Sequence, residues 1–242
     1  MTDKQAISDK ELSIVIGGVN RTGGDGRDTL EGTSNNDSLM GGGGDDFLNS
    51  GNSQDTLDGE GGNDVILAGD GDDRARGGAG SDVIYGGAGQ DRLYGNAGND
   101  ELNGDGGDDT LIGGTGADLI NGGQGGDTIV WSNGAGNDTI DGGPDNDVLT
   151  LQMTNETLDR AFGVSLNGMT SSEVLNGIIS KSGVFTPDPG SSMPTLRGNY
   201  IDLTGFSGTI TINHEQIRVT NLERLYVQNL PTEPDAMRAE VT

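Results

Sequence analysis

The stretch Gly77–Tyr94, "GGAGSDVIYGGAGQDRLY", contains two nine-residue units of nearly the same sequence. Each unit has glycine at positions one, two and four, aspartate at position six and an aliphatic residue at position eight. Glycine adopts a positive φ at little cost, so the opening predicts a tight turn that exposes main-chain carbonyl groups. Position eight and its neighbours favour a very short strand of three residues, with one side chain inward and two outward. Such a strand buries too little alone, so the unit predicts stacking into a solenoid.

The unit recurs with a period of nine residues through most of the first 150 positions. Its sixth-position aspartates are Asp28, Asp37, Asp46, Asp55, Asp64, Asp73, Asp82, Asp91, Asp100, Asp109, Asp118 and Asp127. Two residues after each aspartate stands Leu or Ile, except at Ala75. After an insertion at Trp131–Ser132, the phase resumes at Asp138 and Asp147. A disordered glycine-rich linker would not keep an acid and an aliphatic residue in phase over so many units.

The composition requires stabilisation beyond an ordinary apolar core. The 242 residues include 46 glycines, 39 acidic and 13 basic residues, which give a net charge of -26. An acidic surface of this kind repels nucleic acid and attracts cations, so we expect no nucleic-acid partner. The chain has no cysteine, which excludes disulfides and thiolate metal sites. No apolar run approaches the roughly 20 residues of a membrane span.

Aspartates beside glycine turns offer carboxylate and carbonyl oxygens, which are the hard ligands that calcium prefers. The unit "GGAGSDVIY" resembles the G-G-x-G-x-D-x-U-x nonapeptide of the RTX, or hemolysin-type, calcium-binding proteins. The resemblance covers Gly23 to about Thr150. It implies an all-β fold, a right-handed parallel β-roll in which two units make one turn, so that residues eighteen apart stack. It also implies that each calcium ion lies between stacked loops, bound by their aspartates and loop carbonyls.

The eighteen-residue stacking sorts the aspartates onto two edges of the roll. We expect about eight to ten calcium ions in all. Asn35 and Ser53 replace the fourth-position glycine in the loops of Asp37 and Asp55, so this pair is predicted to be the weakest site. Without calcium the stacked carboxylates repel one another, so metal binding and folding are expected to be one event. The predicted calcium ligands are Asp28, Asp46, Asp64, Asp73, Asp82, Asp91, Asp100, Asp109, Asp118 and Asp127.

One outward-facing set of residues is apolar: Phe47, Val65, Leu67, Val83 and Tyr85. We predict that this surface, through Phe47, Val65, Val83 and Tyr85, takes part in self-association or binds a surface ligand. The alternative interpretation is that these side chains pack against one another or reflect strand propensity alone.

Residues 1–18, "MTDKQAISDKELSIVIGG", lack the features of a secretory signal peptide. They resemble the double-glycine leader of bacteriocin-like peptides, whose pattern is L-S-x-x-E-L-x-x-I-x-G-G. The matching residues are Ile7, Ser8, Glu11, Leu12, Val15, Gly17 and Gly18. The resemblance implies cleavage after Gly18 by the leader peptidase of an ABC-type exporter, with a mature chain that begins at Val19. The alternative is a strand over residues 12–16 that caps the first rung.

Composition changes after the repeats, and residues 151–242 are predicted to form a mainly β cap on the open end of the roll. The stretches "YIDLTG", "GTITIN" and "RVTNLERLYV" favour strands, and "SSEVLNGIISK" favours a short helix. The predicted organisation is therefore a leader over 1–18, an RTX roll over 19–150 and a capping region over 151–242. In related proteins the C-terminal tail carries a type I secretion signal, which is a second route for export.

Catalytic motifs are missing from the sequence. The single histidine, His214, excludes an H-E-x-x-H zinc site and is expected on a surface strand. There is no cysteine nucleophile and no G-x-S-x-G motif, so the chain is predicted not to be an enzyme. We expect a secreted, extracellular bacterial protein that folds on binding calcium outside the cell and serves in surface or matrix attachment. The alternatives are a bacteriocin-like or toxin effector and an enzyme with its site in residues 151–242.

Overall fold

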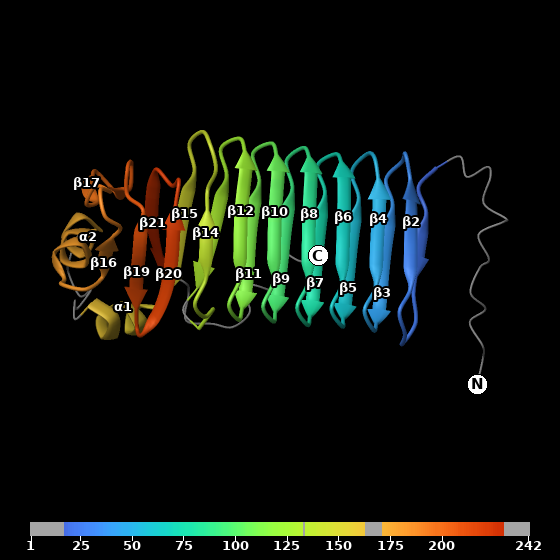
Figure 1. Cartoon of the computed structure of the whole chain (residues 1–242), viewed down its shortest axis with the longest axis horizontal. Helices are drawn as coiled ribbons and strands as arrows, with labels where there is room; N and C mark the ends of the chain where they lie inside the picture. Colours follow the sequence, from blue (N-terminus) through green and yellow to red (C-terminus); the bar gives the residue numbers. More distant parts are fainter. Residues whose placement is uncertain (1–16, 133, 163–170, 230–242) are drawn as a thin grey trace.

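The computed structural model describes residues 17–132, 134–162 and 171–229, and it forms an elongated roll of two facing sheets (Figure 1). Successive strands of the repeat alternate between the sheets, so the prediction of a parallel β-roll is confirmed. The eleven-stranded sheet takes from the repeats β1 (Asn20–Thr22), β3 (Ser38–Gly43), β5 (Thr56–Gly61), β7 (Arg74–Ala79), β9 (Arg92–Ala97), β11 (Thr110–Thr115), β13 (Thr128–Ser132) and β15 (Val148–Met153). The ten-stranded sheet takes β2 (Thr29–Thr33), β4 (Phe47–Gly51), β6 (Val65–Asp70), β8 (Val83–Ala88), β10 (Glu101–Gly106), β12 (Leu119–Gln124) and β14 (Thr139–Asp141).

The register between neighbouring strands is eighteen residues, as the resemblance to the RTX proteins implies. Val83 of β8 pairs with Val65 on one side and with Glu101 on the other. Across the insertion the offset becomes twenty, because Leu119 pairs with Thr139. The insertion is therefore absorbed in a loop, and the alignment of the two sheets is kept.

Most strands of the repeat are twice as long as the three residues expected. Strand β8 runs over six residues, Val83–Ala88, because the parallel ladder continues through the glycines of the next unit. Exposure alternates along the strand, so that Ile84 and Gly86 face inward. The aliphatic column is closed to solvent, with Ile84 and Leu93 both 0% exposed.

The outward apolar side chains on the ten-stranded sheet are half-buried and lie in register with one another. Phe47 pairs with Val65, Val65 with Val83, and Leu67 with Tyr85. Each of the five therefore loses part of its exposure to the stacked rungs above and below.

The C-terminal region continues both sheets before it closes the end of the roll (Figure 1). Its elements are α1 (Asn155–Phe162), α2 (Ser171–Ser180), β16 (Phe185–Pro187), β17 (Thr195–Arg197), β18 (Tyr200–Asp202), β19 (Gly208–Ile212), β20 (Glu215–Thr220) and β21 (Arg224–Asn229). Strand β20 pairs in parallel with β14, and β21 pairs in parallel with β15, whereas the other pairings here are antiparallel. The predicted strands and the helix are present, and α1, β16 and β17 are additional.

The single histidine of the sequence does not lie on a strand. His214 lies in the exposed turn between β19 and β20 and has a positive φ of 77°, so its placement on a strand was wrong.

In the described part of the chain, no helix has the length and apolar character needed to cross a membrane.

Candidate calcium-binding ladders

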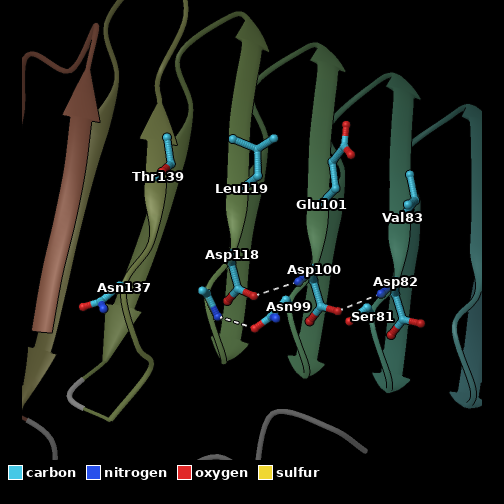
Figure 2. Close-up of a pocket in the computed structure, with 11 residues that line it drawn as sticks. Ser81, Asp82, Val83, Asn99, Asp100, Glu101, Asp118, Leu119, Asn137 and Thr139 are labelled. Carbon is cyan, nitrogen blue, oxygen red and sulfur yellow. Dashed lines mark hydrogen bonds between the residues drawn. The ribbon is translucent and has the colours of Figure 1, made fainter.

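The sixth-position aspartates form two ladders of hydrogen bonds along the edges of the roll. In each ladder, the main-chain N–H of one aspartate donates to Oδ1 of the aspartate one rung later. The N–H of Asp82 donates to Asp100 at 2.9 Å, and the N–H of Asp100 donates to Asp118 at 2.9 Å (Figure 2). We call the loops that lead into the ten-stranded sheet the first edge, and those that lead into the eleven-stranded sheet the second edge.

The second carboxylate oxygen of most of these aspartates is buried and has no hydrogen-bond partner. Among the described residues, such Oδ2 atoms belong to Asp46, Asp55, Asp64, Asp73, Asp82, Asp91, Asp100, Asp109, Asp118, Asp127 and Asp147. Burying a carboxylate oxygen without a partner is costly, so eleven such oxygens in two regular rows point to a missing positive charge.

Nine of these eleven oxygens lie close to the first glycine of their own loop, and the other two, those of Asp55 and Asp73, belong to loops that begin with Ser50 and Ala68. A Cβ placed on Gly95 would lie 2.4 Å from Asp100 Oδ2 and 2.4 Å from the carbonyl oxygen of Gly113 in the next rung. Two oxygens therefore approach the point where a side chain would otherwise stand. We call this point the oxygen cradle of the loop. A side chain added to one of these glycines would displace the carboxylate or the carbonyl.

Burial raises the pKa of the ladder carboxyls, and neighbouring carboxylates raise several of them further. The pKa reaches about 7 for Asp73, Asp100 and Asp109. It reaches about 6 for Asp64, Asp91, Asp118 and Asp147. Among the ladder aspartates whose pKa is raised, a basic side chain of the described residues lowers the pKa only at Asp46, through Arg27, and a bound metal would supply the positive charge that the rows need.

The donor set fits calcium rather than a transition metal. The cradles present carboxylate and carbonyl oxygens, without histidine or cysteine. Within residues 17–132, 134–162 and 171–229, no group of three or more acidic, histidine or cysteine side chains is arranged to bind a metal ion. Each ion would therefore take part of its ligands from main-chain carbonyls, as the glycine turns allow.

Nine of the ten predicted ligands have a buried Oδ2 without a hydrogen-bond partner, and Asp28 does not. Asp28 Oδ2 accepts the N–H of Gly24 at 2.7 Å and lies half-buried near the open end of the roll. Asp55 and Asp147 have the same unpartnered Oδ2 as the other nine but were left out of the prediction. The phase of Asp147 after the insertion was the signal that could have identified it.

The loop of Asp37 is degenerate in a way that the sequence indicated. Thr33 donates to the Asp37 carboxylate through its N–H and its hydroxyl, so Asp37 is absent from the unpartnered set. Asn35 has no positive φ, whereas Ser53 in the next loop on this edge has a φ of 82°. The substitution at Asn35 therefore changes the loop, and the substitution at Ser53 is tolerated with strain.

Three cradles are already filled by side chains. Ser50 and Ala68 occupy the first position of the loops of Asp55 and Asp73, and both are buried. Trp131 occupies the same position in the loop of Asp138, and its side chain is 2% exposed. Asp138 is absent from the unpartnered set, whereas Asp55 and Asp73 belong to it. The first edge thus has uninterrupted glycine cradles up to Asp118, whereas the second edge has them from Asp91 onward.

Comparison with known proteins agrees with this geometry. The family model for the RTX calcium-binding nonapeptide repeat (4 copies) matches residues 22–57, 51–75, 58–93, 67–102, 94–129 and 134–151, which together make more than half of the chain. No curated protein matches the chain. Among solved structures, the extracellular lipase LipA from Serratia marcescens is similar at 16% identity and a TM-score of 0.30, over 83% of this chain and 37% of the lipase. The matched repeats and their stacked aspartate loops show that the chain belongs to the RTX calcium-binding nonapeptide repeat family.

Proposed function

We propose that this protein is exported and folds outside the cell by binding about ten calcium ions along its two edges. The observation that carries the proposal is the set of eleven buried carboxylate oxygens without partners. Calcium supplies positive charge to these oxygens and to the carbonyls beside them. The proposed ligands are Asp147 and the nine predicted aspartates whose buried Oδ2 has no hydrogen-bond partner. The Asp37 loop is the weakest position.

A calcium count on the full chain tests the proposal. The protein is dialysed against calcium, and bound metal is measured by atomic emission alongside a calorimetric titration. We expect about ten ions per chain and a gain of β-structure during the titration. A chain that binds two ions or fewer, or that has full β-structure before calcium is added, would contradict the proposal.

We propose that export uses the double-glycine leader and an ABC-type exporter. Most of the leader lies outside the described residues, but Gly17 and Gly18 are included. A Cβ on Gly17 would meet nothing within 4 Å, whereas a Cβ on Gly18 would lie 1.5 Å from the carbonyl oxygen of Asn36, so Gly18 packs closely against the loop of Asp37. The N–H of Val19 donates to Asp37 Oδ1. After cleavage this nitrogen would be an ammonium group beside the weakest calcium position.

Mass spectrometry of exported protein tests the leader. A terminus at Val19 supports it, and an intact Met1 or Thr2 terminus would refute it. Export that persists without residues 1–18 but stops when the last residues are removed would favour the C-terminal type I signal instead.

We propose surface or matrix attachment as the extracellular role, without catalysis. The outer face of the ten-stranded sheet offers half-buried apolar side chains, Phe47, Val65, Val83 and Tyr85, over three consecutive rungs. Binding of calcium-loaded protein to cell-surface and matrix preparations tests this role, with Val83→Lys as the surface variant. Growth inhibition of neighbouring bacteria by the purified protein would favour the bacteriocin-like alternative suggested by the leader.

A further inference from the structure

The ladder on the second edge does not end with the repeats. The N–H of Asp127 donates to Asp147 Oδ1 at 2.8 Å, and the N–H of Asp147 donates to Glu223 Oε2 at 2.7 Å. Strand β21 lies beside β15 in parallel register, with Arg224 opposite Val148. Glu223 therefore stands at the aspartate position of one more rung, although it is 76 residues away from Asp147 in the sequence.

The carbonyl half of the cradle is also continued by the C-terminal region. A Cβ on Gly122 would meet the carbonyl oxygen of Gly142 at 2.4 Å, and a Cβ on Gly142 would meet the carbonyl oxygen of Asn221 at 2.1 Å. Asn221 has a φ of 49°, a left-handed conformation that asparagine tolerates. A short turn between β20 and β21 thus provides both a carboxylate and a carbonyl, as the six-residue repeat loops do.

The carboxylate that faces this cradle needs a ligand. Asp147 is 0% exposed, its Oδ2 has no partner, and that oxygen lies 2.8 Å from the Cβ point of Gly142. Burial, followed by the charges of Asp127, Glu223 and Asp145, raises the pKa of Asp147. The adjacent arginine, Arg224, stands over the ring of Tyr200, 5.7 Å from its centroid, and none of the ion pairs found among the described residues involves Asp147.

We propose that a calcium ion binds between the loop 142–147 and the turn 221–223, with Asp147 Oδ2, the Glu223 carboxylate and the carbonyl of Asn221 among its ligands. This inference rests on the proposed calcium loading of the roll. It assigns a ligand to the C-terminal region, outside the repeats. The ion would join that region to the last rung of the second edge.

The first edge has no counterpart to this site. There Arg218 of β20 pairs with Thr139 of β14, so Ile217 stands at the position that follows Asp138 in the ladder. Trp131 fills the preceding cradle. The two edges therefore end differently, and only the second continues with a carboxylate into the C-terminal region among the residues described.

Glu223→Gln tests the site in the full chain, because glutamine keeps an oxygen that accepts the Asp147 N–H and removes the charge. The matched control is Glu215→Gln. Glu215 also joins the C-terminal region to the roll, since its Oε2 accepts the N–H of Gly134 at 3.1 Å, but it is outside the ladder. Bound calcium is counted by atomic emission, and hydrogen exchange follows the amides of β21 with and without calcium.

We expect Glu223→Gln to bind one calcium fewer than the wild type and to lose the calcium-dependent protection of β21, while Glu215→Gln matches the wild type. An unchanged count and unchanged protection in Glu223→Gln would overturn the site and leave Glu223 as a hydrogen-bond acceptor only. A wild-type chain that binds no calcium would instead refute the proposed function itself.

A second measurement does not depend on the folding of a variant. Terbium replaces calcium in oxygen sites, and its positions in wild-type crystals are located by anomalous scattering. A terbium peak between Asp147 and Asn221 supports the site. Peaks at the repeat cradles of the second edge without one at this position would overturn it.

Discussion

The roll and the C-terminal region bury different chemistry. Most rungs of the roll bury one aliphatic side chain and one carboxylate per strand, and all the buried charged side chains among the described residues lie between Asp37 and Asp147. The C-terminal region buries aromatic and aliphatic groups, such as Phe185 and Phe206 in edge-to-face contact, with centroids 5.8 Å apart. Its charged pair Arg218–Asp188 stays near the surface. If the proposed function holds, the comparison teaches that one region depends on a bound cation and the other on packing.

Calcium removal should separate the two regions most strongly. With a chelator present, we expect the amides of β3 to β13 to exchange freely, because the unpaired carboxylates repel and each rung contributes little core. Amides of β19 and β20 should keep more of their protection, since their core does not contain carboxylates. Hydrogen exchange measured by mass spectrometry gives both regions at once. Equal protection in both would mean that the regions fold as one unit.

Phe206→Ala should destabilise the C-terminal region by about 3 to 5 kcal/mol, because it removes a buried aromatic ring and leaves a cavity. Excess calcium should not restore this loss, since no ladder carboxylate is affected. Thermal unfolding at low and saturating calcium provides the measurement. Full recovery at saturating calcium would show that the C-terminal region is held by the roll and not by its own core.

Asp91→Asn should destabilise the calcium-loaded roll by about 3 kcal/mol, because it removes a charge from an open cradle in the middle of the second edge. Asp37→Asn is the matched variant, and we expect it to cost less, since Thr33 already binds that carboxylate. Chemical unfolding at saturating calcium compares the two. A larger effect at Asp37 would contradict the order of the sites.

The calcium-free protein should show opposite pH dependence in its two regions. Ladder carboxyls such as Asp73 and Asp100 have a pKa of about 7 in the folded chain, above the unfolded value of about 4. Their contribution to folding is therefore complete below pH of about 4 and is lost as the pH rises through about 7.

Asp188 has its pKa lowered by the hydrogen bond from Arg218, so its smaller contribution is present above pH of about 4 and is lost as the pH falls through the lowered pKa. Circular dichroism in calcium-depleted buffer from pH 3 to 8 should show β-structure of the roll appearing toward acid. A roll signal that grows toward alkaline pH would contradict this assignment.

The periodic part of the structure could be predicted from the sequence because each position of the repeat has the same environment in successive units. An acid and an aliphatic residue two positions apart, repeated every nine residues, predicted the core column represented by Ile84 and Leu93, and the resemblance to the RTX proteins implied the eighteen-residue register and the two edges. Strand length could not be predicted in the same way. Pairing continues through glycines such as Gly87, which have low intrinsic strand propensity but lie in the ladder with Gly69.

The ends of the ladders could not be read from the repeat, because the residues that form them are outside it. Glu223 and Asn221 match no position of the nonapeptide and reach the second edge only through the pairing of β21 with β15. Trp131 was visible as an insertion, but only the pairing of β13 with β11, in which Val130 lies opposite Ile112, places it in register with the cradle glycine Gly113. The hydrogen bonds that Thr33 donates to the Asp37 carboxylate likewise depend on the shape of one loop.

The eighteen-residue register also limits how the gene for this protein can change in length. Duplication or loss of two consecutive units would add or remove one full turn, and every strand after the change would stay in its own sheet. Duplication of a single unit would move all later strands into the opposite sheet. The turn with Glu223 would then face the wrong edge, beside the position now taken by Ile217. Adding an even number of units therefore preserves the structure of the C-terminal region. Adding a single unit would require a different C-terminal region.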